Sequence, residues 1–315
     1  MKRLQALIVG KGKVGTALSK ALNKREWASR FFEQRNDMKA FRVLIQKVDV
    51  VFITISTKDE GQEELDYVTV CLESGIPVVT CAKGMLAYQF DKVRSDLPRI
   101  GFTASVGGNS GMLKLLTDAP RKARGIKRIV FTPNGSLNFS CSSLQRPDST
   151  EEATFLGAWQ LELLEPEAKN LRQALMAEVM VDSLRKAAIV YNVSGLGSIV
   201  KPDSFNPMEM SGDYMIELMR VPGTRFVVEI RRARHNARNM DCFWFQDGPW
   251  LITGSFQKSA SRLFRNVPID CFKCAMILRR NGGSKKAASG LGAGSSHTAE
   301  RMIANAFELL TARIP

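Results

Sequence analysis

The chain has 315 residues, of which 45 are Lys or Arg and 31 are Asp or Glu, so its formal net charge is +14. Hydrophobic residues make up 44% and charged residues only 24%, a balance that excludes disordered, collagen-like and small disulfide-rich proteins. At about 100–200 residues per domain, this length predicts two domains, each with its own core.

Apolar runs such as residues 4–9 and 48–53 are far shorter than the roughly 18–20 residues that span a bilayer, so we expect no membrane helix. The N-terminus has cations before an apolar stretch, as a secretory leader does. However, Lys11 and Lys13 follow at once, and no small-residue cleavage site appears. We therefore expect a cytoplasmic protein that begins with a strand. Its six cysteines are widely spaced, which favours free thiols over a disulfide framework.

Up to about residue 132, short β-rich runs alternate with longer amphipathic stretches, as in successive βαβ units. Strands are expected at residues 4–9, 48–55, 78–80, 100–104 and 129–132. Helices are expected at residues 14–22, 63–73 and 85–97. This order predicts a doubly wound α/β domain, in which helices cover both faces of a parallel sheet.

The pattern changes beyond residue 138. Helices are expected around residues 151–164 and 171–191, and strands at residues 225–230, 241–245 and 250–253. Turn-forming residues separate these strands, which indicates antiparallel pairing. A Gly-rich turn at residues 290–294 then leads into a final amphipathic helix at about residues 298–310.

Residues 10–15 read G-K-G-K-V-G, a G-x-G-x-x-G sequence between a hydrophobic strand and a helix. Gly10 permits a tight turn, Gly12 lets a pyrophosphate approach the backbone, and Gly15 allows close packing of helix on strand. The phosphates would lie on the helix N-terminus, at Lys13 and Val14. The alternative is a purely structural glycine turn.

The second strand ends near Glu33 and Arg35. Glu33 lies close to the usual separation for an acid that binds the ribose hydroxyls of NAD, whereas Arg35 is suited to the 2′-phosphate of NADP. Both residues could instead be solvated at a strand end. The expected cofactor is therefore NADP or NAD, with the choice left open.

Further segments resemble one known family. Residues 74–83, S-G-I-P-V-V-T-C-A-K, resemble the part of homoserine dehydrogenases in which a strand ends in threonine, a short linker and a lysine, here Lys83. Residues 104–111, A-S-V-G-G-N-S-G, are similar to the family's next strand and Gly-rich loop. Residues 134–139, N-G-S-L-N-F, are similar to its N-G-T-x-N-Y turn, and residues 290–294, G-L-G-A-G, to its G-x-G-A-G element. These matches follow the family's order and cover about residues 1–145 and 285–315.

The resemblance implies a Rossmann-type NAD(P)-binding domain made of residues 1–135 and 285–315, because the last helix returns to it. Residues 136–284 would form an α+β catalytic and dimerisation domain with a largely antiparallel sheet. The implied reaction is hydride transfer between NAD(P) and the small-molecule pair L-homoserine and L-aspartate 4-semialdehyde, in threonine, methionine and isoleucine biosynthesis. A homodimer is implied as well.

The expected site follows from the same resemblance. Lys83 lies just past the carboxyl end of a parallel strand, where open α/β sheets bind their ligands. It is expected to be catalytic, binding the substrate or moving a proton beside the nicotinamide, and the alternative is an ordinary surface lysine. Asp182 and Lys186 lie four apart on one helix face. The resemblance implies that this lysine exchanges the hydroxyl proton while the aspartate binds substrate, although an ordinary exposed ion pair has the same spacing. The remaining expected contacts are Ser56, Thr57 and Gly292 for the cofactor, and Asn134 and Gly135 for the substrate.

Residues 163–168, L-L-E-P-E-A, replace the family's Gly-Tyr-Ala-Glu stretch and Asp-Pro pair. The glutamate expected to bind the substrate's amino group is then Glu165 or Glu167. The altered segment leaves two alternatives open. One is a dehydrogenase of another small amino-acid-like substrate, and the other is a nucleotide-binding homologue without catalysis.

Two further patterns receive weaker interpretations. Cys271 and Cys274 form a C-x-x-C pair, but the nearby Cys242 and His235 do not complete a common zinc spacing, so we expect buried thiols and no metal. The basic run 231–238 lacks interleaved aromatics and any helix-turn-helix or zinc-finger spacing, which disfavours nucleic-acid binding. It is interpreted as a solvated loop between strands.

Overall fold

A computed structural model describes residues 3–34, 37–118, 125–164, 167–233, 242–258 and 260–312. The chain forms two compact units, Met1–Asn109 with Ser295–Pro315, and Ser110–Gly294. These bounds differ from the expected domain boundaries at residues 135 and 285. No described helix is long and apolar enough to cross a membrane.

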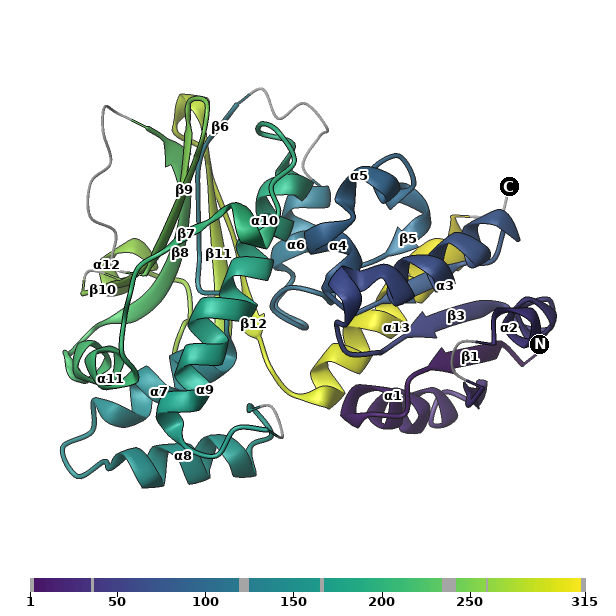
Figure 1. Cartoon of the computed structure of the whole chain (residues 1–315), viewed down its shortest axis with the longest axis horizontal. Coiled ribbons are helices and arrows are strands. Elements are labelled where there is room, and N and C mark those ends of the chain that lie inside the picture. The colour runs from purple at the N-terminus through teal and green to yellow at the C-terminus, as the bar shows by residue number, and fades with distance from the viewer. Residues whose placement is uncertain are drawn as a thin grey trace. The chain divides into compact units, whose positions relative to one another are not determined.

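The first unit is built on a five-stranded sheet in the order β2-β1-β3-β4-β5, in which neighbouring strands pair in parallel (Figure 1). The strands are β1 Gln5–Val9, β2 Ala28–Phe32, β3 Val50–Ile53, β4 Val78–Thr80 and β5 Ile100–Gly101. All residues of β3 and β4 are buried, as expected for parallel strands that are covered on both faces. The predicted parallel sheet is confirmed.

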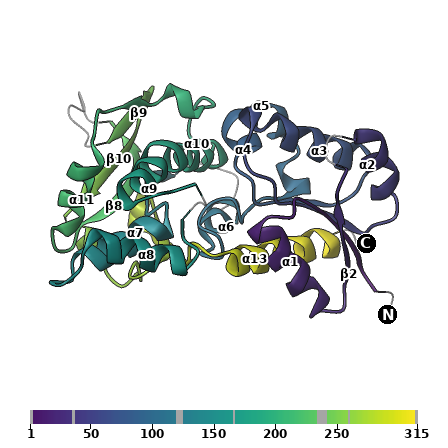
Figure 2. The same ribbon diagram turned by 60° about the horizontal axis from the view of Figure 1, so that its bottom comes forward.

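Helices of the first unit come from both ends of the chain. They are α1 Lys13–Asn23, α2 Met38–Ile45, α3 Gln62–Glu73, α4 Gly84–Tyr88, α5 Phe90–Val93 and α13 Ser295–Thr311. On one face of the sheet, Ile8 and Phe52 pack in a core with Leu18 of α1 and Met302 of α13. Figure 2 shows α1 and α13 side by side. The single helix predicted at residues 85–97 is instead two short helices.

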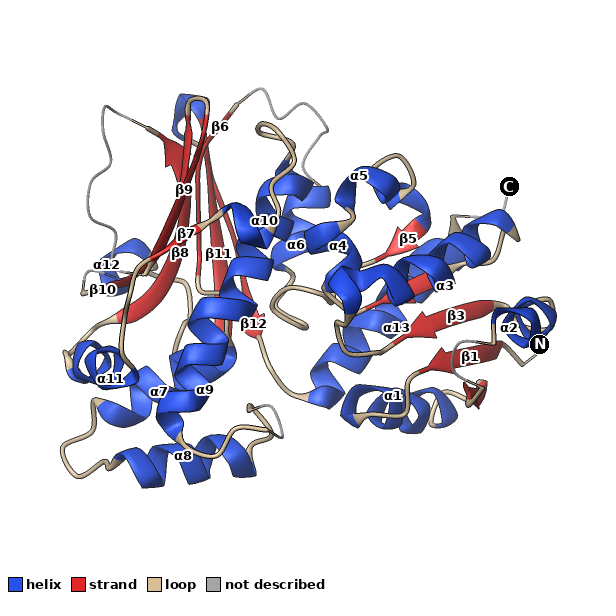
Figure 3. Cartoon of the chain, viewed as in Figure 1, coloured by secondary structure: helices blue, strands red, loops and turns tan. Residues whose placement is uncertain are grey.

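The second unit is built on a seven-stranded sheet in the order β12-β11-β6-β8-β10-β9-β7, with antiparallel pairings throughout (Figure 3). The strands are β6 Ile126–Phe131, β7 Asn206–Pro207, β8 Arg225–Arg232, β9 Phe243–Asp247, β10 Trp250–Gln257, β11 Lys273–Arg280 and β12 Lys285–Leu291. The predicted antiparallel sheet is thus confirmed, although β11 and β12 were not predicted.

One predicted strand belongs to the other sheet. Residues 129–132 were assigned to the parallel sheet, but β6 pairs antiparallel with β8 and β11, so that assignment is wrong. The physical reason lies in Lys127 and Arg128, which follow the first residue of the strand and are not buried. Such positions fit an antiparallel sheet that faces water, whereas parallel strands are buried on both faces. The Gly-rich turn predicted at residues 290–294 likewise includes the end of β12.

Helices of the second unit are α6 Met112–Thr117, α7 Gly135–Leu144, α8 Glu151–Gln160, α9 Leu171–Ala177, α10 Ser183–Ser194, α11 Gly212–Arg220 and α12 Ala260–Leu263. A single π turn, Glu178–Asp182, joins α9 to α10, so the helix predicted at residues 171–191 is present with one widened turn. This π turn positions the polar cluster described below.

Candidate functional site

The glycine loop joins β1 to α1. Gly10 has φ +105°, in the region that favours glycine, and a Cβ there would lie 2.9 Å from the carbonyl carbon of Thr54. A Cβ on Gly15 would overlap the Gly10 carbonyl oxygen. The Thr54 hydroxyl lies 2.9 Å from the same oxygen and donates to it, which fixes the turn. Both glycines are therefore required by the fold itself.

Gly12 is different, because a Cβ there would meet no protein atom within 4 Å. It precedes the first residue of α1 in extended conformation, and the first turn of that helix carries no acidic residue. The first turn of a helix directs its N–H groups outward and carries the positive end of the helix dipole. The open space at Gly12 therefore fits a pyrophosphate that approaches the backbone.

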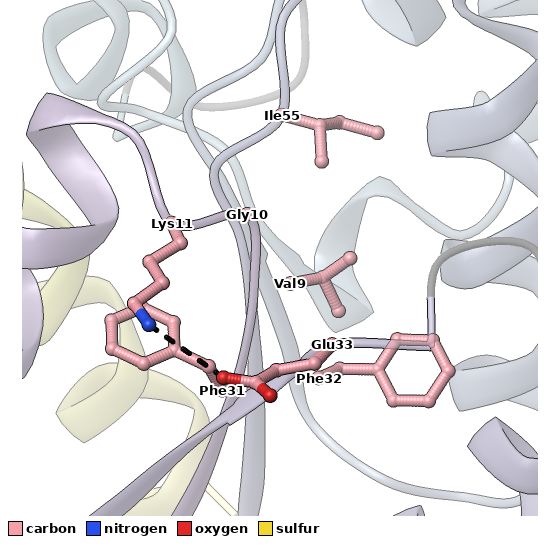
Figure 4. A pocket seen from close by; sticks show the side chains of 7 residues that line it. All are labelled: Val9, Gly10, Lys11, Phe31, Phe32, Glu33 and Ile55. Carbon is pink, nitrogen blue, oxygen red and sulfur yellow. Dashed lines mark ion pairs between the residues drawn. The ribbon is translucent and has the colours of Figure 1, made fainter.

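Next to this loop lies a cavity of about 290 Å³, lined by Val9, Gly10, Lys11, Phe31, Phe32, Glu33 and Ile55 (Figure 4). Lys11 and Glu33 form an ion pair of 3.6 Å across it, and both side chains are more than two-thirds exposed. Lys11 also lies 5.7 Å from the centre of the Phe31 ring. An exposed pair of this kind contributes little, so a ligand can separate it at low cost. Arg35 lies outside the described residues.

Lys83 precedes α4, one short linker after β4. A Cβ on Gly84 would lie 2.6 Å from the Cα of Gly61 and 2.9 Å from Cγ2 of Thr57, so the loop after β3 packs tightly on this turn. Ser56, next to Thr57, is exposed. The structure thus gathers three expected cofactor contacts, Ser56, Thr57 and Lys83, at one end of the parallel sheet.

A buried carboxyl group that the sequence did not reveal supports the Lys83 turn. Glu64 of α3 is 2% exposed, and it accepts hydrogen bonds from the Thr80 hydroxyl at 2.6 Å and from the Met85 N–H at 2.9 Å. It therefore joins the residues on either side of Lys83. Burial raises the pKa of Glu64 to about 6, and the bonds from Met85 and Thr80 and the charge of Lys83 oppose that rise.

In the second unit, Asn134 connects three side chains of the helix that contains the π turn. Its Nδ2 donates to Glu178 Oε2, and to Asp182 Oδ2 at 2.8 Å, while its Oδ1 lies 3.1 Å from the Ser183 hydroxyl. Lys186 Nζ lies 2.6 Å from Asp182 Oδ2. The expected residues Asn134, Asp182 and Lys186 are therefore brought together.

This cluster is not an ordinary surface ion pair, because Lys186 is only 7% exposed. Its Nζ also donates to the carbonyl oxygen of Pro133 at 3.0 Å. The π turn also helps to position the cluster, because the Ser183 hydroxyl lies 2.8 Å from the carbonyl oxygen of Glu178, five residues earlier. π turns are frequent at functional sites. The spacing Glu178, Asp182, Lys186 was the signal for Glu178 that sequence reasoning missed.

Two glycines hold the neighbouring backbone close. A Cβ on Gly135 would lie 2.6 Å from the Phe272 carbonyl oxygen, and a Cβ on Gly292 would overlap Cys274 Sγ. Burial raises the pKa of the Cys274 thiol to about 12, so it is protonated at neutral pH. The described cysteines are free thiols, and within the described ranges no group of three metal-binding side chains occurs. Cys274 is buried as expected, but Cys271 is exposed, so the expectation of two buried thiols is wrong for Cys271. In the structure, Gly135 and Gly292 allow close packing. Their expected contacts with substrate and cofactor stay predictions.

Neither of the two glutamates expected in the altered segment has a described contact with the cluster. Glu165 lies outside the described residues, and Glu167 is exposed. Glu178, which is half-buried beside Asn134, is instead the second carboxylate of the cluster.

No protein-family model and no curated protein matches the chain. Solved structures do match over its whole length. A homoserine dehydrogenase from Thiobacillus denitrificans has a TM-score of 0.68 at 17% identity, and the match covers 100% of this chain and 76% of that one. A putative homoserine dehydrogenase from Archaeoglobus fulgidus has a TM-score of 0.67 at 17% identity, covering 98% and 99%. A hyperthermophilic archaeal homoserine dehydrogenase in complex with NADPH has a TM-score of 0.65 at 17% identity, covering 100% and 99%. The chain therefore has the homoserine dehydrogenase fold.

Proposed function

We propose that the chain is an NAD(P)-dependent homoserine dehydrogenase, which interconverts L-aspartate 4-semialdehyde and L-homoserine in the biosynthesis of threonine, methionine and isoleucine. The observation that carries the proposal is the cluster of Asn134, Glu178, Asp182 and Lys186 in a chain with this fold. An amino acid substrate has an ammonium group for the carboxylates and an oxygen for the lysine.

The glycine loop would hold the cofactor. Gly10 and Gly15 shape the turn, and the backbone at Gly12, Lys13 and Val14 would donate hydrogen bonds to the pyrophosphate. Glu33 would bind the ribose hydroxyls, or Arg35 the 2′-phosphate of NADP. Ser56, Thr57, Lys83 and Gly292 are the proposed nicotinamide-side contacts. When bound, the nicotinamide supplies the carbon that gives or accepts the hydride.

Lys186 would act on the reacting oxygen. Asp182 and the Pro133 carbonyl occupy two of its three N–H donors and so fix its direction. The third would donate to the aldehyde oxygen of the semialdehyde. As hydride reaches the aldehyde carbon, that proton passes to the oxygen and gives the hydroxyl of homoserine. General acid catalysis of this kind contributes about 100- to 10,000-fold.

Asp182 and Glu178 would bind the substrate. Their carboxylates share the Asn134 amide, which holds them in one orientation. Such a pair attracts the α-ammonium of an amino acid, and Glu178 would then serve where the resemblance places a glutamate in residues 163–168. The structural argument for Glu178 is its place in the cluster, whereas Glu167 is exposed.

The test is homoserine-dependent reduction of NADP or NAD by the purified protein, with Lys186→Ala and the control Lys201→Ala, which removes an exposed lysine of the same unit. We expect turnover that Lys186→Ala abolishes and Lys201→Ala preserves. Absence of turnover with either cofactor, with Lys186→Ala binding homoserine as wild type does, would contradict the proposal.

A second candidate, a dehydrogenase of another small amino-acid-like substrate, is motivated by the altered residues 163–168 and by Glu178. A panel of L-homoserine, L-serine and 4-hydroxybutyrate separates the two. If Glu178 binds the ammonium group, wild type prefers homoserine over 4-hydroxybutyrate, which lacks that group, and Glu178→Gln reduces the preference. The expected homodimer rests on the resemblance, and light scattering measures the oligomeric state.

A further inference from the structure

Four adjacent strands of the antiparallel sheet each carry two consecutive cations at the same end, the upper end in Figure 3. We call this set the basic rim: Lys285 and Lys286 of β12, Arg279 and Arg280 of β11, Lys127 and Arg128 of β6, and Arg231 and Arg232 of β8. Its members come from four separate segments of the chain. Of the run 231–238, which was interpreted as a loop, Arg231 and Arg232 belong instead to β8, and residues 234–238 lie outside the described residues.

The strand register aligns one cation from each strand. Lys285 is opposite Arg279, Arg279 is opposite Arg128, and Arg128 is opposite Arg231. Residues directly opposite one another point to the same face of a sheet. With strands about 4.8 Å apart, this row of four cations spans about 14 Å. Along β8 and β12 the other cation of the pair points to the opposite face, because side chains alternate along a strand. Between β6 and β11 the register shifts at Arg279 and Arg280, which interrupts this alternation.

Little negative charge balances the rim. Among the described residues, Glu229 is the one carboxylate that forms ion pairs with the rim, at 2.8 Å from Arg128 and 3.3 Å from Arg231. Lys127, Arg232, Arg279, Lys285 and Lys286 are exposed. Like charges directly opposite one another destabilise a sheet. An anionic partner with several negative charges would remove that repulsion.

We propose that the basic rim binds the phosphate backbone of a nucleic acid. Guanidinium groups bind phosphate oxygens with two parallel hydrogen bonds, and five of the eight rim residues are arginines. A duplex carries one charge per roughly 1.7 Å, so about 14 Å of duplex presents about eight phosphates, enough to pair with the four cations of the row. The partner is not a membrane surface, since none of the large exposed hydrophobic side chains described lies on these four strands.

This binding would be largely independent of base sequence. The rim consists of strand ends whose side chains reach phosphates, and it lacks the recognition helix that reads base edges. It goes beyond the proposed dehydrogenase activity, since all eight residues lie outside both clusters described above.

The test is fluorescence anisotropy of a short labelled DNA duplex, titrated with the full chain at several salt concentrations. If the four cations of the row contact phosphates, the logarithm of affinity falls against the logarithm of salt with a slope of about −4. The triple variant Arg279→Gln, Lys285→Gln, Lys286→Gln removes three exposed cations. We expect it to weaken binding at low salt at least about tenfold and to make the slope shallower by about 2 to 3.

The control variant Lys24→Gln, Lys47→Gln, Lys92→Gln removes the same charge from exposed positions of the other unit. It should bind the duplex as wild type does. An equal loss of duplex affinity in both variants would overturn the proposed role of the rim, because the net charge of the chain would then explain the binding. A nucleic-acid partner would be overturned by either of two results. One is that poly-L-glutamate displaces the labelled duplex as effectively as unlabelled duplex does, and the other is that the chain binds phosphatidylserine vesicles more tightly than the duplex. Dehydrogenase activity unchanged in the rim variant would show that the two properties are separate.

Discussion

Glu64 makes the stability of the first unit depend on pH in a direction opposite to that of most carboxylates. Burial raises its pKa from an ordinary value of 4.5 to about 6. A carboxyl whose pKa is higher in the folded state contributes stability that is fully present below pH 4.5 and is lost as pH rises through about 6. This difference in pKa corresponds to about 2 kcal/mol.

The perturbation is Glu64→Gln, which keeps the shape of the side chain and removes its titration. The amide oxygen can still accept from Met85, while the amide nitrogen donates to the Thr80 oxygen. Urea unfolding at several pH values from about 4.5 to about 7.5 gives the free energy of unfolding of both proteins. We expect the variant to gain about 2 kcal/mol relative to wild type across this range.

The matched control is Glu63→Gln, which removes a carboxylate from the same helical turn at a position that is not fully buried. Its free-energy difference from wild type should not show this gain. If the difference between Glu64→Gln and wild type stays constant from low to high pH, the buried carboxyl does not titrate as described, and the reasoning fails.

Three other changes test the structure. Gly15→Ala should lower the free energy of unfolding by about 1–3 kcal/mol and also weaken NADPH binding, because its Cβ is obstructed. Gly12→Ala should weaken only NADPH binding, which calorimetry measures. Equal losses of stability in the two variants would contradict this. Lys186→Met should lower kcat about 100-fold or more without changing NADPH affinity, and a normal kcat would exclude its role in proton transfer. Tyr191→Phe removes a 2.7 Å hydrogen bond to Asp247 and should lower the free energy of unfolding, measured in urea, by about 1.5 kcal/mol. An unchanged midpoint of urea unfolding would refute this.

The parallel sheet was predictable because its strands are short apolar runs, as in Val50–Ile53, and because G-x-G-x-x-G fixes where the first of them ends. The assignment of residues 129–132 failed because a strand's hydrophobicity does not reveal its partner. Pairing of β6 with β11, about 150 residues later in the chain, depends on contacts that local patterns do not contain.

The site shows the same division. Asp182 and Lys186 could be predicted because i,i+4 spacing places them on one helix face. Glu178 also precedes Asp182 by four residues, but that spacing alone does not show that Glu178 reaches Asn134, which lies 44 residues earlier in the chain. Glu64 was missed since a carboxylate within an amphipathic helix normally faces water, and only the approach of the Thr80–Met85 turn buries it.

The basic rim is a third case. The net charge of +14 pointed to an anionic partner, but the cations of β6, β8, β11 and β12 are separated by long stretches of sequence. Register alone places Lys285, Arg279, Arg128 and Arg231 in one row. Part of the excess charge therefore has a defined location.

The central claim, hydride transfer to an amino acid aldehyde, is tested most directly by following the hydride itself. The purified protein is incubated with L-aspartate 4-semialdehyde and with NADPH or NADH in which deuterium replaces both hydrogens at nicotinamide C4. The product is then examined by mass spectrometry. The account predicts homoserine that carries deuterium on C4, formed by wild type and not by Lys186→Ala. Absence of homoserine with both cofactors, or homoserine without deuterium, would contradict it.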